Sequence, residues 1–241
     1  MDTPKIPKSF KIESKPSKFC PGCGYGIILK SLGWVIDETE IQEKAVLMTD
    51  IGCNLLAWDF FNIPTCQTHH GRTVTTAVGY KLADAGKSVI CLIGDGGGYA
   101  IGLQNLLHAC LRNTPLTVIL ANNTVYSMTS GQVSPTSLES QVTDSTPDGK
   151  KGVQSGTIFG PELLRKVAKP EAFIARTSTL KPMEVKKFLK LALDAQKAGN
   201  FSFVEVISAC PLNWRTDAKE TLERVKELEK TFVQGEIVTN C

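Results

Sequence analysis

The 241-residue sequence lacks a long apolar run, a strong charge imbalance and a low-complexity linker. No apolar run approaches the roughly 20 residues that a membrane-spanning helix needs, so we expect no membrane span. The formal net charge is only +3, and no basic stripe interleaved with aromatic residues occurs, which argues against a nucleic-acid partner. Residues 1–18 are rich in Lys, Pro and Ser and do not resemble an apolar signal segment. We therefore expect a cytoplasmic protein with one domain over residues 1–241.

Apolar runs of strand length alternate with amphipathic segments along the chain. The apolar runs are 45–48, 88–93, 116–121, 172–176 and 201–207. Helical spacing of apolar residues occurs in 25–38, 72–85, 99–112 and 182–198, and a charged helical tail occupies 217–230. This alternation predicts an α/β fold with a mostly parallel sheet and helices on both of its faces. Residues 122–160 do not fit this alternation of strand-like and helical segments. A loop of this length inside a compact domain is usually functional, and we expect residues 143–156 to be mobile or to contact a partner.

Polar motifs follow two of the expected strands. Gly94, Asp95, Gly96 and Gly97 follow one apolar run, and Asn122–Asn123 follow the next. Because the carboxyl ends of parallel strands meet at one edge of a sheet, these motifs are expected to face the same ligand. A carboxylate, an amide oxygen and a main-chain carbonyl suit a hard cation such as Mg²⁺, and the glycines let the backbone approach a phosphate. The pattern therefore predicts a magnesium ion carrying a diphosphate.

Four cysteines form a second group of candidate binding residues. Cys20 and Cys23 make a two-cysteine knuckle, and Cys53 and Cys210 lie at the ends of two expected strands. The four thiols can converge near the diphosphate site, where they would bind either zinc or an iron–sulfur cluster; the spacing alone does not choose between the two. Cys91 and Cys110 lie in apolar runs and are expected in the core. In a reducing compartment none of the eight cysteines is expected to form a disulfide.

Taken with 125–132, which directly follow the two asparagines, these motifs resemble the thiamine diphosphate-binding beta subunit of the 2-oxoacid:ferredoxin oxidoreductases. The similarity runs from Cys20 to about Val238 and is nearest to the 2-oxoglutarate and branched-chain 2-oxoacid branch. It implies a thiamine diphosphate-binding fold in which Asp95, Asn123 and the Val125 carbonyl bind Mg²⁺. It also implies one [4Fe–4S] cluster, bound by Cys20, Cys23, Cys53 and Cys210.

The same resemblance implies the other cofactor contacts. A similar His-Gly-Arg in the family makes His70 a candidate for contact with the diphosphate. The family reads Thr-Gly-Gly-Gln where this chain has Thr129-Ser130-Gly131-Gln132, a difference that concerns the local turn. The full set of expected cofactor-binding residues is Gly22, Cys23, Asp50, Ile51, Gly52, Cys53, His70, Gly94, Asp95, Gly96, Gly97, Asn123, Val125, Tyr126, Ser127, Met128 and Thr129.

The implied reaction is the reversible, coenzyme A-dependent oxidative decarboxylation of a 2-oxoacid, with electrons passing through the cluster to ferredoxin. No catalytic residue is assigned to this chain, because the activating Glu of the family comes from the pyrimidine-side domain of an alpha subunit. A gamma subunit, a ferredoxin-like delta subunit or both are also implied. Two alternatives are a non-redox thiamine diphosphate decarboxylase subunit and a zinc-stabilised module without catalysis.

Overall fold

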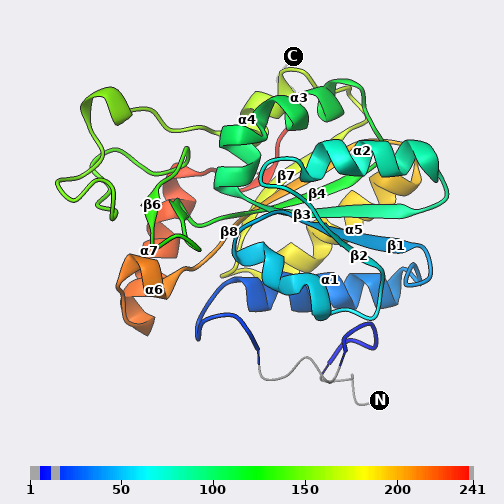
Figure 1. Cartoon of the computed structure of the whole chain (residues 1–241), viewed down its shortest axis with the longest axis horizontal. Coiled ribbons are helices and arrows are strands. Elements are labelled where there is room, and N and C mark those ends of the chain that lie inside the picture. Colours follow the sequence, from blue (N-terminus) through cyan, green and yellow to red (C-terminus); the bar gives the residue numbers. More distant parts are fainter. Residues whose placement is uncertain (1–5, 12–16, 239–241) are drawn as a thin grey trace.

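The computed structural model describes residues 6–11 and 17–238 and is built around a seven-stranded sheet (Figure 1). The strand order is β2-β1-β3-β4-β8-β7-β9. All strand pairs of this sheet are parallel except β7 with β9. The strands are β1 (Ala45–Thr49), β2 (Thr65–Gln67), β3 (Ser88–Gly94), β4 (Thr117–Asn122), β7 (Phe173–Ser178), β8 (Ser202–Ile207) and β9 (Gly235–Glu236). The predicted α/β fold with a mostly parallel sheet is confirmed.

Helices cover both faces of the sheet, with α2 and α3 on one side and α1 on the other (Figure 1). The first layer contains α2 (Thr73–Ala83), α3 (Leu103–Leu111) and α4 (Gly160–Arg165), and the second contains α1 (Tyr25–Glu38) and α5 (Pro182–Lys197). Alternate residues of one strand serve the two cores: Ile90 and Leu92 pack with the α1 and α5 layer, whereas Cys91 and Ile93 pack with the other. The strands are therefore buried on both sides, which explains why they appear as continuous apolar runs.

The helix α1 coincides with its predicted range, whereas the helix predicted at 99–112 differs from the observed one. A π-helical segment, η3 (Gly97–Ile101), precedes α3, which begins only at Leu103. The glycine loop, residues 94–98, therefore runs into η3 rather than into an ordinary helix start. Cys91 and Cys110 are fully buried, as expected. Cys241 lies outside the described residues.

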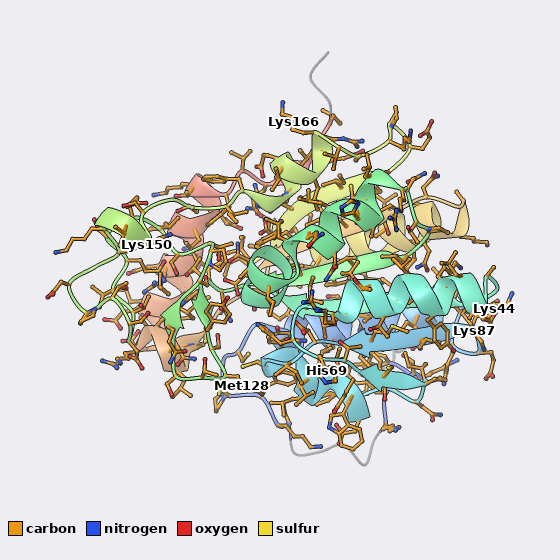
Figure 2. All side chains as sticks on the ribbon, turned by 45° about the horizontal axis from the view of Figure 1, so that its top comes forward. Lys44, His69, Lys87, Met128, Lys150 and Lys166 are labelled. Atoms are coloured by element: carbon orange, nitrogen blue, oxygen red, sulfur yellow. The ribbon has the colours of Figure 1, made fainter. Side chains whose placement is uncertain are left out.

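The long loop after β4 carries regular structure and many internal hydrogen bonds. It contains a short hairpin of β5 (Val125–Tyr126) and β6 (Gln132–Val133) and a 3-10 helix, η4 (Gly152–Gln154). Lys150, labelled in Figure 2, is 2% exposed and donates hydrogen bonds to the carbonyls of Ser137 and Gly156. These contacts give much of the loop a defined path, and the expected partner contact of 143–156 stays a prediction.

A third core cluster joins this loop to the end of the chain. Val125 packs there with Trp214 of α6 (Pro211–Trp214) and with Val225 of α7 (Ala218–Thr231). A capping box between Asp217 and Glu220 begins α7. None of the helices in residues 6–11 and 17–238 has both the length and the apolar character needed to cross a bilayer.

Candidate functional site

Two adjoining cavities lie at the carboxyl edge of the sheet. We name the larger one, of about 290 Å³, the Asp95 cavity, and the smaller one, of about 60 Å³, the thiol cavity. Tyr25, Cys53, Asn123 and Ser127 line both and form the wall that they share. This edge of a parallel sheet is where α/β proteins bind their ligands. Met128 lines the Asp95 cavity. In Figure 2 it lies well away from Lys44 and Lys87, the residues that directly precede β1 and β3.

All but three of the predicted cofactor-binding residues line the Asp95 cavity. Of the three exceptions, Cys23 lines the thiol cavity, and Gly22 and Asp50 line neither. Tyr25 and Asn54 also line the Asp95 cavity but were not among the predicted residues. Each adjoins a predicted motif, since Tyr25 follows the cysteine knuckle and Asn54 follows Cys53, so their positions held a usable signal.

Asp95 follows β3 and is only 3% exposed. Its Oδ2 atom accepts hydrogen bonds from Ser134 Oγ at 2.7 Å and Thr136 Oγ1 at 2.5 Å, two residues that the sequence did not indicate. Burial raises the pKa of this carboxyl group to about 6, although the two hydroxyl groups act in the opposite direction. A buried carboxylate of this kind favours a cation beside it, because a neighbouring positive charge stabilises the ionised form.

Asn123 follows β4 and forms part of the wall that the two cavities share. Its Oδ1 atom accepts a hydrogen bond from Val125 N at 3.2 Å, and its Nδ2 atom donates to Ser127 Oγ at 2.6 Å. Trp214 Nε1 donates to the Asn123 carbonyl at 3.0 Å. The structure thus brings the three predicted magnesium-binding residues, Asp95, Asn123 and Val125, to one cavity. Their carboxylate, amide and carbonyl oxygens are the donors that Mg²⁺ prefers.

Two glycines of the loop are required by neighbouring side chains. A Cβ atom at Gly96 would overlap the ring of Tyr126, and a Cβ atom at Gly97 would overlap the carboxylate of Asp50. Tyr126 and Asp50 therefore already pack against the glycine loop and fix its position. Close approach to a phosphate was the predicted reason for these glycines, and the structure adds this second one.

Asp50 lines neither cavity, and its expected direct contact with a cofactor stays a prediction. Its carboxylate is buried, and Oδ1 accepts a hydrogen bond from Gly71 N at 2.8 Å. His70 Nδ1 lies 3.5 Å from Oδ2, which accepts no hydrogen bond from the residues that the structure describes, and 3.0 Å from the Ile51 carbonyl. His70 itself lines the Asp95 cavity, so Asp50 acts on the site through His70 and the glycine loop.

Gly22 belongs to the knuckle turn, and its expected contact with a cofactor stays a prediction. Its φ of +75° lies in the left-handed region, and Pro211 packs against it. Cys23 N donates to the Cys20 carbonyl at 3.1 Å, which closes the turn. Gly24 N donates to the Ala209 carbonyl at 3.0 Å and ties the knuckle to the segment before Cys210. Gly22 therefore shapes the turn that presents Cys20 and Cys23.

The structure brings the four predicted cysteines to one cavity. Cys20, Cys23, Cys53 and Cys210 all line the thiol cavity, although they come from distant parts of the chain. Burial raises the pKa of Cys23 to about 12 and that of Cys53 to about 11, and in both cases the nearby cysteines add to the increase. Such thiols ionise readily only when a metal binds them. All cysteines of the described residues are free thiols.

The arrangement of the sulfurs bears on the kind of metal. Among residues 6–11 and 17–238, no group of three or more His, Cys, Asp and Glu side chains could hold a single metal ion as placed. A tetrahedral zinc site with Zn–S bonds of about 2.3 Å would need its sulfurs about 3.8 Å apart. Thiolates that bind a cluster through separate iron atoms lie farther apart than those around one ion. Either a cluster or zinc would use the four thiols of the thiol cavity as ligands.

The turn after β5 accommodates the serine that departs from the family pattern. Ser130 has a φ of +86°, and Gly131 has a φ of +97°. Both residues therefore adopt the left-handed conformation that glycine tolerates best. Ser130 keeps the backbone shape of a Gly-Gly turn at a conformational cost.

The parallel sheet and the two-part motif at its carboxyl edge are those of a thiamine pyrophosphate-binding domain. The family described as "Thiamine pyrophosphate enzyme, C-terminal TPP binding domain" matches residues 50–206. The 2-oxoglutarate synthase subunit KorB of Archaeoglobus fulgidus is 33% identical over 90% of this chain and 78% of its own length. The chain belongs to the family of beta subunits of the 2-oxoacid:ferredoxin oxidoreductases.

Other relatives differ in length and in the substrate that their names give. The ketoisovalerate oxidoreductase subunit VorA of Methanothermobacter thermautotrophicus is 38% identical over 89% of this chain, which spans about half of that relative (46%). The 2-oxoacid:ferredoxin oxidoreductase subunit beta of Saccharolobus solfataricus is 34% identical over 88% of this chain and 68% of its own length. These names agree with the branch that the sequence motifs indicate.

A solved structure has the same fold. The 2-oxoglutarate:ferredoxin oxidoreductase from Magnetococcus marinus, with 2-oxoglutarate, coenzyme A and succinyl-CoA bound, matches with a TM-score of 0.80. The match covers 98% of this chain and 85% of that chain at 24% sequence identity. At this identity the match establishes the fold.

Proposed function

We propose that residues 1–241 form the thiamine diphosphate-binding domain of a hetero-oligomeric 2-oxoacid:ferredoxin oxidoreductase. In its reaction a 2-oxoacid, coenzyme A and two oxidised ferredoxins give an acyl-CoA, carbon dioxide, one proton and two reduced ferredoxins. The reaction is reversible when a sufficiently strong reductant is present. One observation carries the proposal: a cavity with oxygen donors for a metal diphosphate shares a wall with a cavity lined by four thiols.

In this proposal Asp95, Asn123 and the Val125 carbonyl hold Mg²⁺, which binds the diphosphate. The backbone amides of the glycine loop and the His70 side chain contact the diphosphate oxygens, while Asp50 holds Gly71 and His70 in place. Met128 and Tyr126 line the same cavity and would border the organic part of the cofactor. When bound, thiamine diphosphate supplies a nucleophilic carbon and accepts the electrons released as carbon dioxide leaves.

The four cysteines would hold one [4Fe–4S] cluster in the thiol cavity. The raised pKa values of the Cys23 and Cys53 thiols mean that metal binding must displace protons from these two groups, which a cluster with several iron charges can do. Lys18 also lines this cavity and provides a positive charge beside the thiolates. The free thiols fit a reducing compartment, and we propose the cytoplasm.

Partner chains would complete the site. In the described part of the chain, Asp95 is the only carboxylate that lines the Asp95 cavity, and it is assigned to the metal. The carboxylate that activates the aminopyrimidine ring must therefore come from another chain, which we propose is an alpha subunit. Gamma or ferredoxin-like delta subunits would carry electrons onward to ferredoxin.

The substrate is proposed only by class. The relatives named for ketoisovalerate and for 2-oxoglutarate are similarly distant, at 37–38% and 32–36% identity. A branched-chain 2-oxoacid and 2-oxoglutarate are therefore the first substrates to test, in the presence of coenzyme A.

Two other functions are weaker candidates. A non-redox thiamine diphosphate decarboxylase subunit would use the Asp95 cavity, but it would leave four converging thiols without a role. A zinc-stabilised module would use the thiols, but it would leave the oxygen donors of the Asp95 cavity without a role.

The test is to co-purify the chain with its partner subunits and compare Cys210→Ser with Cys66→Ser. Cys66 is a matched control because it lies on β2 and does not line the thiol cavity. We expect Cys210→Ser to lose iron, the absorbance shoulder near 400 nm and coenzyme A-dependent viologen reduction, while thiamine diphosphate still binds. Cys66→Ser should keep all four properties. A wild-type complex that binds zinc and no iron would overturn the proposal.

A further inference from the structure

A polar bridge crosses the wall between the two cavities. Ser127 lines both cavities, and its hydroxyl group accepts a hydrogen bond from Asn123 Nδ2 at 2.6 Å. On its other side, Ser127 Oγ lies 3.4 Å from the Sγ atom of Cys210, within hydrogen-bonding distance. One hydroxyl group therefore contacts both a residue assigned to the magnesium site and a residue assigned to the cluster.

Asn213 completes the bridge from α6. Its Nδ2 atom donates to the Ser127 carbonyl at 2.9 Å and to Cys210 Sγ at 3.5 Å. The neighbouring Trp214 donates to the Asn123 carbonyl, so α6 is attached to this wall at two points. The amide of Asn213 is thus held in a fixed orientation toward the sulfur.

The direction of these hydrogen bonds depends on the state of the sulfur. A protonated Cys210 can donate to Ser127, whereas a metal-bound thiolate can only accept. In the thiolate state the Ser127 proton therefore points to the sulfur. The weak contact of that hydroxyl with the Val125 carbonyl, at 3.5 Å, is then lost, and this carbonyl becomes free to bind a cation. Cluster binding and metal binding would thus favour the same orientation of the Ser127 hydroxyl.

We propose that Asn213 and Ser127 set the reduction potential of the cluster by donating hydrogen bonds to the Cys210 sulfur. This inference rests on the proposed function. Reduction adds negative charge to a cluster and its thiolates, and donors to sulfur stabilise the more negative state. The two donors therefore raise the potential of the cluster, which makes it a better acceptor for electrons leaving the adjoining cavity. They are positioning residues and make no contact with the substrate in this role.

The test is a redox titration, followed by electron paramagnetic resonance, of the co-purified complex and its Asn213→Leu and Ser127→Ala variants. Each variant should have a more negative potential. At a fixed potential near the midpoint, we expect about a tenfold change in the ratio of reduced to oxidised cluster, which is 59 mV for one electron. Ser127→Thr, which keeps the hydroxyl group, should restore the wild-type value.

Two further variants make the result specific. Thr216→Val is the matched control, because Thr216 follows α6 and its hydroxyl group bonds to Thr221 rather than to a sulfur. Its potential should equal that of the wild type. Asn213→Asp keeps the size of the side chain but replaces the donor by a negative charge, and its potential should be the most negative of the set.

The outcomes separate this inference from the proposed function. A wild-type complex without a [4Fe–4S] signal would overturn the proposed function. A wild-type complex with the signal, together with unchanged potentials in Asn213→Leu and Asn213→Asp, would overturn the inference alone. Loss of iron from both Asn213 variants, with Thr216→Val replete, would also overturn it, because the amide would then serve to retain the cluster.

Discussion

Oε1 of Glu205 accepts a hydrogen bond from Nδ2 of Asn122 at 3.0 Å, and both residues are fully buried. The same oxygen accepts a second hydrogen bond from the Tyr99 hydroxyl group at 3.0 Å, and Oε2 accepts one from Nε of the buried Arg176. Asn122 directly precedes Asn123, and Tyr99 directly follows the glycine loop. Glu205 on β8 therefore links the end of β4, which carries Asn123, to the segment that follows the glycine loop.

Glu205→Ala should strongly destabilise the chain, because it would leave the buried Arg176 with Glu162 as its remaining carboxylate partner. Removing one partner of a buried ion pair costs about 3–5 kcal/mol of unfolding free energy. Urea unfolding of the purified chain measures this loss. The control is Lys190→Ala, which breaks the exposed pair with Asp194 and should change stability little. Similarly small losses in both variants would contradict the structural role given to Glu205.

Gly96→Ala should weaken thiamine diphosphate binding, because the added methyl group would overlap the ring of Tyr126 and displace it or the loop. Overpacking of this kind costs about 1–3 kcal/mol, so we expect the affinity to fall by about tenfold or more in a calorimetric titration with cofactor and Mg²⁺. Gly26→Ala is the matched control. Outside the backbone of α1 and the two neighbouring residues, no atom of the described part of the chain lies within 4 Å of the added methyl group there, and α1 should gain stability from the better helix former. Equal affinities in the two variants would contradict the packing argument.

Asp50 should make the stability of the apo chain fall as the pH rises above the ordinary carboxyl pKa of 3.8. Burial raises the pKa of Asp50 above that value, although Gly71, His70 and Thr73 oppose the increase, and Cys91 and Tyr126 also face the carboxylate. Above pH 3.8 the unfolded chain releases this proton before the folded chain does, so stability is lost until the pH exceeds the folded-state pKa.

The check on this effect is a series of urea unfolding curves for the wild type and Asp50→Asn between pH 4 and pH 8. The asparagine keeps an acceptor for Gly71 N but does not titrate, so the difference in stability should move in favour of the variant as the pH rises. A difference that stays constant over this range would show that Asp50 ionises equally easily in both states.

The sequence predicted the central strands because burial on both faces makes them continuous apolar runs. It did not predict β2 (Thr65–Gln67) or β9 (Gly235–Glu236), which are edge strands of two or three residues without an apolar run. The π-helical η3 was also missed, since its apolar spacing resembles that of an ordinary helix. These elements depend on tertiary contacts rather than on a local pattern.

The residues of the candidate site also divide into those that a local sequence pattern indicates and those that only the fold reveals. Asp95, Asn123 and the four cysteines lie in motifs with characteristic neighbours, and the sequence indicated them directly. Ser134 and Thr136 bond to Asp95 from a loop rich in hydroxyl residues, where no local pattern distinguishes two serines or threonines from the others. Asp50 lies in a predicted turn, but only the fold shows that its carboxylate is buried against Gly71 and the glycine loop.

Ser130→Gly should stabilise the chain, because Ser130 holds a φ of +86° that glycine adopts without the same steric cost. A side chain in the left-handed region costs about 1 kcal/mol, and the larger unfolded-state entropy of glycine offsets part of this, so we expect thermal or urea unfolding to show a gain below about 1 kcal/mol. The control is Ser155→Gly, where φ is −63°; the change adds unfolded-state entropy and removes a side-chain hydrogen bond to Glu139, so stability should fall slightly. Cofactor affinity should be the same in Ser130→Gly as in the wild type, since the backbone already follows the path of a Gly-Gly turn. A loss of stability in Ser130→Gly would mean that the serine hydroxyl group, rather than the backbone, determines this turn.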